Sequence, residues 1–290
     1  MDHSICPVCG NPLTLKYRLK FNVYKCANCG LLNSDARFEH SFQSDLESES
    51  RDIGLKQIRL KNFATIIKEL QKYQGNKDNK ISGLEIGSGN GWWLETCKEN
   101  NIDCIGIEPE RIYANYHKEN NLDIIYGFYP DVNPKKEKGY DFIIFNDVFE
   151  HIEDINGLVE NLKKDLNEDG MLIINLPMST GFFNKMATRM HKLGFSSFLN
   201  RLWQFNFHSP HMNYFNEHNM KLLLNRHGFS TVNVLTLDTL DFSSVKERIM
   251  ADRGMGKLKA LFLTFALTLL KPVITSSEPD VKAFFFKKRS

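Results

Sequence analysis

The chain has 290 residues, of which 42% are hydrophobic and 25% charged, and 37 Lys and Arg stand against 35 Asp and Glu. This composition is that of a globular protein with room for one large domain and a small accessory module, and it excludes large-scale disorder. The formal net charge of +2 is too small to indicate a nucleic-acid-binding protein by itself, although it is compatible with a local basic patch.

The N-terminal segment is polar and leads directly into a cysteine pair at Cys6, so it has neither the basic start nor the apolar core of a secretory signal. We therefore expect a cytoplasmic location. In a reducing compartment, closely spaced cysteines favour a metal site over disulfides. Isolated Cys97 and Cys104 are expected to be buried free thiols. The remaining cysteines form two pairs: Cys6, Cys9, Cys26 and Cys29.

The two cysteine pairs lie in nearly identical segments, Cys-Pro-Val-Cys-Gly at 6–10 and Cys-Ala-Asn-Cys-Gly at 26–30. The glycine that ends each segment allows a tight turn, which lets backbone N–H groups face the sulfurs. Between the pairs, alternating apolar and polar residues predict short strands at 13–20 and 21–25. This pattern resembles a zinc ribbon. Four thiolates leave no coordination position for water, so we predict a structural zinc ion.

Nucleic-acid binding is the alternative role for this ribbon, because basic and aromatic residues alternate along it. The residues that would serve it are Lys16, Arg18, Lys20 and Lys25 with Tyr17, Phe21 and Tyr24.

The segment after the ribbon is polar at first and then amphipathic. Residues 39–50 are rich in serine and acidic residues, which indicates a flexible linker. Apolar residues recur at helical spacing from Ile53 to Tyr73, and Gly75 follows, which predicts a helix. The predicted organisation is a zinc ribbon at 1–38, a linker and helix at 39–77, and a large domain at 78–290.

From Ile81, apolar runs alternate with amphipathic helices, which is typical of an α/β fold with a mostly parallel, doubly wound sheet and helices on both faces. Seven strands are predicted, at 81–86, 104–108, 124–126, 142–146, 171–175, 231–237 and 281–287.

The first of these strands ends in a glycine-rich turn, Leu-Glu-Ile-Gly-Ser-Gly-Asn-Gly at 84–91. Such a turn lets a ligand approach the backbone and the start of the next helix. The spacing Gly-x-Gly-x-Gly differs from the Gly-x-Gly-x-x-Gly of dinucleotide enzymes. Glu108 ends the second strand, where a carboxylate can accept hydrogen bonds from both hydroxyls of a ribose.

Residues 84–91 resemble motif I of the class I S-adenosylmethionine-dependent methyltransferases, and Gly-Ile-Glu-Pro at 106–109 resembles their ribose-binding loop. The likeness to the small-molecule branch continues at 140–152, 166–172 and 211–229, and so covers nearly all of 78–290. It implies a Rossmann-like fold, methyltransferase activity and S-adenosylmethionine as cofactor. The cofactor residues implied are Glu85, Gly87, Ser88, Gly89, Gly91, Glu108, Pro109, Phe128, Asn146, Asp147 and Val148.

One position departs from the family pattern. Many members have an acidic residue after the third strand that bonds the adenine amino group, whereas this chain has Gly-Phe-Tyr at 127–129. We therefore expect adenine to pack on Phe128.

Methyl transfer is an in-line displacement on a sulfonium, so the enzyme chiefly aligns the acceptor and excludes water. An oxygen or carbon acceptor also needs a base, and histidine has a suitable pKa. His211 is the first candidate, because the resemblance places its segment over the active site. His151 is the second candidate, and His208 lies in the same segment as His211.

The residues after the fourth strand narrow the range of possible methyl acceptors. Asn-Asp-Val-Phe at 146–149 departs from the Asn/Asp-Pro-Pro-aromatic motif of base-amino methylases, and no cysteine follows Cys104 to serve a pyrimidine carbon methylase. We predict a small-molecule, sugar or lipid-linked acceptor that is methylated at oxygen. An RNA methyltransferase guided by the ribbon and an inactive ligand-binding adaptor are the alternatives.

Two inserts interrupt the predicted domain. The first, at 178–207, is aromatic and basic, which suits a lid or additional core. The second, at about 243–275, includes the largely apolar stretch 258–270, whose uncharged run at 260–270 is shorter than the roughly 20 residues needed to span a bilayer. It predicts either a buried or interface helix or a peripheral membrane contact flanked by Lys257, Lys259 and Lys271.

Overall fold

The computed structural model describes residues 4–37, 45–74, 80–134, 139–205, 207, 209–240, 265, 268–269 and 271–289. The predictions made for His208 and for most of the apolar run at 258–270 lie outside these residues.

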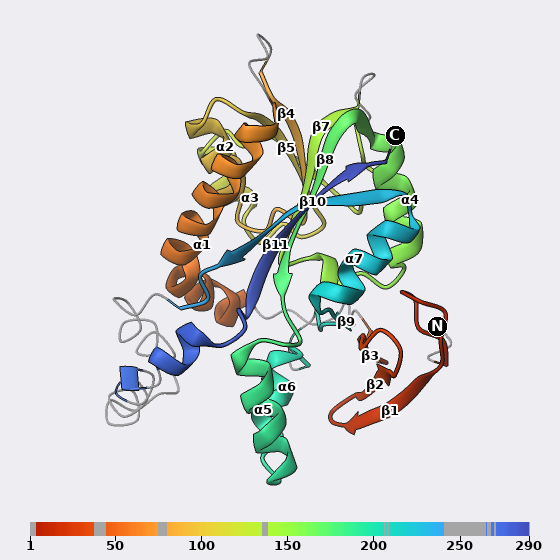
Figure 1. The fold of residues 1–290 in the computed structure, drawn as a ribbon. Coiled ribbons are helices and arrows are strands. Elements are labelled where there is room, and N and C mark those ends of the chain that lie inside the picture. Colours follow the sequence, from red (N-terminus) through yellow and green to blue (C-terminus); the bar gives the residue numbers. More distant parts are fainter. Residues whose placement is uncertain are drawn as a thin grey trace.

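A seven-stranded sheet in the order β10-β11-β8-β7-β4-β5-β6 forms the centre of the molecule (Figure 1). Strands β4 to β8 are parallel, and β11 is antiparallel to its neighbours β8 and β10. The predicted Rossmann-like fold is confirmed, with a strand at each of the seven predicted places. The strands are β4 (Ser82–Ile86), β5 (Asp103–Glu108), β6 (Ile124–Tyr126), β7 (Tyr140–Asn146), β8 (Leu166–Pro177), β10 (Phe229–Leu237) and β11 (Val281–Lys288).

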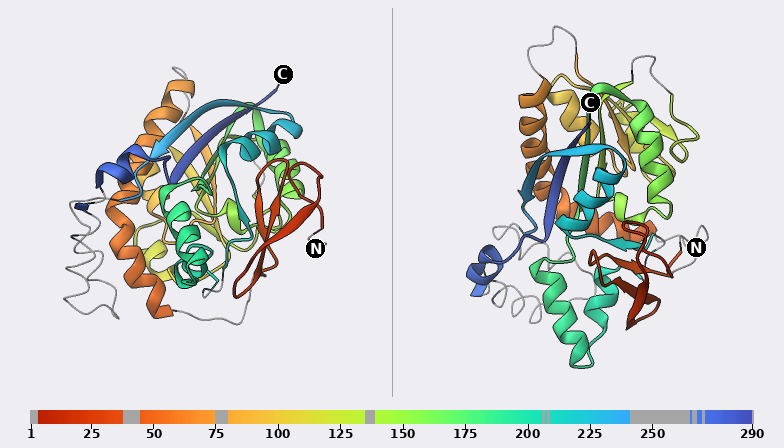
Figure 2. Two further views of the ribbon diagram at one scale, coloured as in Figure 1. Left: turned by 60° about the horizontal axis from the view of Figure 1, so that its bottom comes forward. Right: turned by 45° about the vertical axis from the view of Figure 1, so that its right-hand side comes forward.

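Helices cover both faces of this sheet (Figures 1 and 2). Successive residues of β7 alternate between the two sides, because side chains of a strand point to opposite faces. Phe142 and Ile144 pack in the hydrophobic cluster that contains Trp93, on one face of the sheet. Ile143 and Phe145 pack in a second hydrophobic cluster, on the opposite face. One face carries α1 (Asp45–Gln74) and α2 (Trp92–Glu99), and the other carries α4 (Ile155–Asp165) and α7 (Glu217–Arg226). The small elements α3 (Ala114–Glu119) and η1 (Phe149–His151) follow β5 and β7.

Helix α1 begins at Asp45 rather than at the predicted Ile53, so the linker prediction was wrong for residues 45–50. The sequence there is acidic, and acidic residues are favourable near the positive N-terminal end of a helix dipole. The same composition is typical of a linker, which explains the error.

The N-terminal sheet contains one strand from the large domain. It has the order β1-β2-β3-β9, and its last pair brings Asn33 opposite Asn213. The predicted ribbon strands are present, and β3 and β9 are additional. Its strands are β1 (Leu13–Arg18), β2 (Asn22–Cys26), β3 (Leu32–Ser34) and β9 (Asn213–Tyr214).

The first insert forms a helical hairpin of α5 (Phe182–Lys192) and α6 (Ser197–Leu202), which follows the carboxyl end of β8. Its base belongs to the core, since Trp203 and Phe205 are at most 1% exposed. Ala187 and Leu199 pack in one cluster with Val23 of the ribbon, so hairpin and ribbon support each other.

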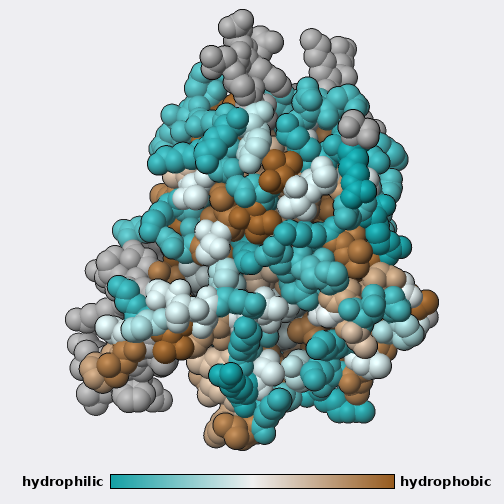
Figure 3. Space-filling view, viewed as in Figure 1, coloured by the Kyte–Doolittle hydropathy of each residue, from teal (hydrophilic) through white to brown (hydrophobic). Residues whose placement is uncertain are grey.

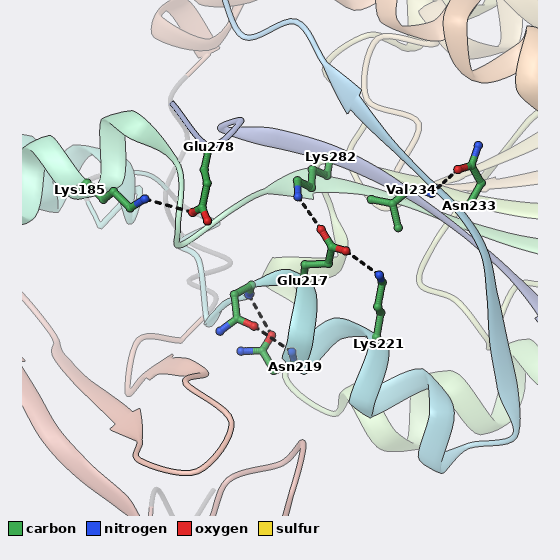
Figure 4. Close-up of polar contacts among 9 residues, drawn as sticks. Lys185, Glu217, Asn219, Lys221, Asn233, Val234, Glu278 and Lys282 are labelled. Carbon is green, nitrogen blue, oxygen red and sulfur yellow. Dashed lines mark hydrogen bonds and ion pairs between the residues drawn. The ribbon is translucent and has the colours of Figure 1, made fainter. Parts of the chain in front are cut away.

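Polar contacts join the start of this hairpin and of α7 to the strand β11 and the segment before it (Figure 4). Lys185 in α5 lies 3.1 Å from Glu278, and Lys282 in β11 lies 2.6 Å from Glu217 in α7. None of the described helices has the length and apolar character needed to cross a bilayer.

Candidate cofactor and acceptor site

The glycine turn after β4 has an open side. Gly87, Gly89 and Gly91 have positive φ angles of 76°, 50° and 85°. A Cβ on Gly87 would lie 2.5 Å from Cγ2 of Val148, so this residue packs against the loop after β7. A Cβ on Gly89 would meet nothing within 4 Å. The turn is therefore closed on the Val148 side and open at Gly89, as a ligand cradle requires.

Glu108 lies beside this opening, because β4 and β5 are adjacent parallel strands. Its carboxylate accepts hydrogen bonds from the backbone N–H of Gly89 at 2.7 Å and of Glu110 at 2.9 Å. Each carboxylate oxygen has two lone pairs, so both can accept a further bond. The predicted neighbours Gly89 and Glu108 are thus brought together.

His117 supports the glycine turn, and the sequence analysis missed it. Its Nε2 lies 2.9 Å from the carbonyl of Gly89 and its Nδ1 lies 2.9 Å from the hydroxyl of Tyr126. A carbonyl can only accept, so Nε2 carries the proton and Nδ1 accepts from Tyr126. Burial lowers the pKa of His117, which favours this neutral ring. No local motif marks His117, since its role comes from the contact between α3 and the turn.

Glu85 is buried under the turn, 2% exposed. Its Oε1 accepts a hydrogen bond from Asn146 Nδ2 at 2.9 Å, and Asn146 Oδ1 in turn lies 3.3 Å from Asn175 Nδ2. Glu85 Oε2 is buried and has no hydrogen-bond partner among the described residues. Burial raises the pKa of Glu85 to about 8. The predicted pair Glu85 and Asn146 is therefore one polar unit, to which β8 adds Asn175.

Three other residues predicted to contact the cofactor are Ser88, Asp147 and Phe128. Ser88 is 6% exposed, and a Cβ on Gly106 would lie 2.3 Å from its Oγ, so β5 approaches the turn closely there. Asp147 has a φ of 56° and forms a 3.4 Å ion pair with Arg59 of α1. The side chain of Phe128 is available to a ligand, since the residue is 51% exposed.

The two histidines predicted from the sequence are in contact, with ring centroids 4.7 Å apart. His151 Nδ1 lies 3.0 Å from the carbonyl of Pro210 and 3.1 Å from Ser209 Oγ. Because the carbonyl can only accept, Nδ1 carries the proton, and Nε2 is the basic nitrogen of the neutral ring. His151 is partly exposed, whereas His211 is 3% exposed.

Glu150 completes this group and was not predicted. It is 1% exposed, and its Oε1 lies 3.8 Å from His211 Nε2. Burial raises its pKa well above the usual range, and the charge of Asp147 adds to this effect, which favours the neutral carboxyl over the carboxylate. Gln204 Nε2 lies 3.0 Å from His211 Nε2 and can only donate to it.

The same three side chains, Glu150, His151 and His211, are close enough to hold a metal ion, with one ligand atom of each within 4.8 Å of the others. A metal ligand must offer a lone pair. His211 Nε2 already accepts from Gln204, so in this arrangement it offers no lone pair to an ion. The arrangement therefore fits two histidines in ring contact, each hydrogen-bonded to other neighbours, better than a metal centre.

The four ribbon cysteines do have the geometry of a metal site. The Sγ atoms of Cys6 and Cys29 are 3.5 Å apart, and those of Cys9 and Cys26 are 3.4 Å apart. All four lie within 4.8 Å of one another. Zinc–sulfur bonds of about 2.3 Å in a tetrahedron place the sulfurs about 3.8 Å apart, so one zinc ion fits this set.

The ribbon also holds the segment that carries His211. Ser34 donates from its backbone N–H to the carbonyl of Met212 at 2.9 Å and from its Oγ to the carbonyl of His211 at 2.8 Å. Met212 N–H in turn donates to the carbonyl of Glu150 at 2.9 Å. The ribbon strand β3 is thus connected to η1 through the residues around His211.

Solved methyltransferase structures share this fold. The chain is similar to phosphoethanolamine N-methyltransferase 2 of Haemonchus contortus, in complex with phosphomonomethylethanolamine and S-adenosylhomocysteine. The TM-score is 0.57 and the identity 14%, over 85% of this chain and 58% of that one. A structure with the Haloferax volcanii Trm112 methyltransferase activator and a methyltransferase has a TM-score of 0.55 at 11% identity, over 86% and 98%. A structure described as a sarcosine dimethylglycine methyltransferase from Galdieria sulphuraria has 0.53 at 16%, over 80% and 85%.

Sequence comparison gives the family. An uncharacterized protein of Methanocaldococcus jannaschii is 31% identical over 107 residues, which are 37% of this chain and 50% of that protein, so the match spans half of this curated relative. A family model described as a methyltransferase domain matches residues 58–234, more than half of the chain. The chain therefore belongs to this methyltransferase family, and the predicted family membership is confirmed.

Proposed function

We propose that this protein transfers a methyl group from S-adenosylmethionine to an oxygen atom of a small-molecule, sugar or lipid-linked acceptor. One observation carries the proposal. The loop after β7 packs against Gly87 through Val148 and, three residues later, reaches His151. The loop after β7 therefore contacts the cofactor cradle through Val148 and carries, three residues later, a histidine with a defined basic nitrogen.

The cofactor part of the proposal rests on Glu108 and Glu85. Glu108 is held at the open side of the turn, where its carboxylate oxygens can accept from two ribose hydroxyls. Glu85 offers a buried Oε2 that has no partner among the described residues, and a cationic ligand would favour its ionised form. The other residues proposed to line the site are Gly87, Ser88, Gly89, Gly91, Pro109, Phe128, Asn146, Asp147 and Val148.

When bound, S-adenosylmethionine would supply an electrophilic methyl group on its sulfonium sulfur, and the rest of the cofactor would be the leaving group, a neutral thioether. His151 is proposed as the base, because Pro210 fixes its tautomer and the ring is partly exposed. Its Nε2 takes the proton of the acceptor hydroxyl as the new carbon–oxygen bond forms. This reverses the order of the two histidines favoured by the sequence, because His211 is buried and engaged by Gln204. His211 is proposed as the residue that positions His151.

Incorporation of labelled methyl from S-adenosylmethionine tests this proposal. The purified protein is incubated with soluble metabolites, with extracted membrane lipids and with RNA, and each fraction is counted. We expect label in a small or lipid-linked molecule. His151→Asn should remove most of the incorporation, whereas the control His218→Asn, at an exposed position of α7, should not. Label mainly in RNA, lost when Lys16, Arg18 and Lys20 are neutralised, would support the alternative of an RNA methyltransferase.

A further inference from the structure

Charge is unevenly distributed in this protein. Residues 3–34 and 170–216 together contain eight Lys and Arg and no Asp or Glu, although the whole chain has a net charge of only +2. These two stretches hold the ribbon and the α5–α6 hairpin, which we call the basic end of the molecule. The rest of the chain is therefore net acidic, and the basic end is suited to an anionic partner.

Contacts between the ribbon and the hairpin bring these charges together. The ring of Tyr17 in β1 packs edge-on against His191 of α5, with centroids 5.3 Å apart. The backbone N–H of Lys20 donates to Asn200 Oδ1 in α6 at 3.1 Å. The basic side chains near these contacts are exposed: Lys16, Arg18, Lys20, Arg189, Lys192 and Arg201.

The tip of the hairpin, residues 193–198, adds exposed apolar side chains to this charge. Leu193 is 75% exposed, Phe195 61% and Phe198 46%. Figure 3 shows hydrophobic surface at the lowest point of the view, over this end of the hairpin, next to hydrophilic surface. Bulky apolar side chains flanked by Lys and Arg are the pattern of segments that lie in a membrane interface.

A second group of exposed apolar side chains also favours a membrane as the partner. Phe265, Leu269 and Val273 are 62%, 63% and 49% exposed. They are spaced by four residues, and each has a helical backbone. In Figure 1 and in the right view of Figure 2, the blue segment at 271–276 lies towards the same lower end of the molecule as α5 and α6.

We propose that the basic end docks on an anionic lipid bilayer, with the hairpin tip in the interface and the Lys and Arg side chains at the headgroups. The hairpin follows the carboxyl end of β8. A docked bilayer would therefore face the carboxyl ends of the parallel strands, where the proposed active site lies. Helix α5 has 11 residues and is therefore about 16 Å long, which leaves space for a headgroup between bilayer and site. The inference deepens the proposed function by making the acceptor a lipid-linked molecule.

RNA is a less suitable partner for the basic end than an anionic bilayer. Single-stranded RNA is bound by stacking bases on exposed aromatic faces. Two of the aromatic rings of the ribbon are engaged by the hairpin instead. Tyr17 packs on His191, and Phe21 packs edge-on against Phe205 with centroids 5.1 Å apart. The exposed tip combines Phe195 and Phe198 with the aliphatic Leu193, which is the most exposed of the three and offers no ring face for base stacking.

Co-sedimentation with vesicles tests the docking surface. The full chain is mixed with vesicles of phosphatidylcholine alone or with an equal amount of phosphatidylglycerol, without S-adenosylmethionine or acceptor. We expect binding to the anionic vesicles only, weakened by salt. Each basic residue near such a surface is worth about fivefold in partitioning, so the triple variant Arg189→Gln, Lys192→Gln, Arg201→Gln should bind roughly a hundredfold more weakly. Leu193→Ser with Phe195→Ser should give a comparable loss.

A matched triple variant removes charge elsewhere. Its substitutions are at three exposed lysines before β4, β6 and β8, on the side of the amino ends of these strands: Lys80→Gln, Lys118→Gln and Lys164→Gln. This control variant should bind anionic vesicles as the wild type does. Equal weakening in both triple variants, no binding to anionic vesicles, or binding of the hairpin to RNA in preference to vesicles would overturn the docking surface. Because vesicle binding is measured without cofactor, its failure leaves the methyltransferase proposal intact, whereas failure to bind S-adenosylmethionine would contradict only the latter.

Discussion

Ser34 of the ribbon donates a hydrogen bond from its Oγ to the backbone carbonyl of His211 at 2.8 Å, and both residues are almost fully buried. The two are far apart in the chain and meet because β3 pairs with β9. The ribbon would therefore form a wall of the proposed acceptor site. A zinc ion bound by the four cysteines would stabilise the ribbon and is expected to influence catalysis indirectly, through this contact.

Ser34→Ala should lower the rate of methyl transfer while zinc content and S-adenosylmethionine affinity stay unchanged. The substitution removes one donor to a buried carbonyl, at a cost of about 1–3 kcal/mol, and so loosens the segment of His211. Thr14→Ala is the control, since Thr14 donates to Lys25 on the exposed side of the same ribbon. A normal rate in Ser34→Ala would show that this contact does not position the histidines.

Removal of zinc should abolish methyl transfer and leave most of the S-adenosylmethionine affinity. The four thiolates close the ribbon, whereas the glycine turn belongs to the central sheet. The measurements are metal content, calorimetry and transfer rate after treatment with a chelator. A Cys97→Ser variant controls for thiol chemistry, because Cys97 lies outside the metal cluster. An unchanged transfer rate with the ribbon unfolded would contradict this role.

Gly89→Ala should weaken S-adenosylmethionine binding, and Gly10→Ala should not. Both glycines have positive φ angles, 50° and 74°, and a Cβ at either position meets nothing within 4 Å. Both variants therefore carry a similar backbone strain of about 1 kcal/mol. Only the Cβ at Gly89 would lie in the cofactor cradle. The two variants should therefore have similar thermal unfolding temperatures, whereas calorimetry should show weaker S-adenosylmethionine binding only for Gly89→Ala. Equal affinity in the two variants would place the cofactor elsewhere.

The stability of the wild type should fall with rising pH relative to Glu85→Gln. The folded pKa of Glu85 is about 8, against an ordinary value of 4.5, because burial disfavours the charged form. The stabilisation by the protonated group is fully present below 4.5 and is lost as pH rises towards about 8. The amide introduced by the substitution keeps an acceptor for Asn146 and does not titrate in this range. Denaturant unfolding of both proteins between these pH values, without cofactor, checks this. Parallel curves would contradict it.

The strands of the central sheet were predictable because parallel strands buried on both faces appear as continuous apolar runs. The glycine turn, Glu108 and the cysteine pairs were predictable because each motif is local in the sequence. Strands β3 and β9 were not, because both are very short, and β9 forms only through its pairing with β3, far away in the sequence. His117, Gln204 and Glu150 were missed for the same reason, since tertiary contacts alone give them a role at the site. The predicted histidine pair was found together, but only the structure distinguished His151 from His211, through the burial of His211 and its hydrogen bond with Gln204.

Calorimetric titration of S-adenosylmethionine into the wild type and Glu108→Ala tests the central claim most directly. Glu119→Ala, at an exposed carboxylate of α3, is the control. We predict that the wild type and the control bind alike. Glu108→Ala should lose about 1.5–3 kcal/mol, roughly tenfold to 150-fold in affinity, because hydrogen bonds to a charged group are lost. Equal binding by all three proteins, with Glu108→Ala correctly folded, would contradict the proposed cofactor site.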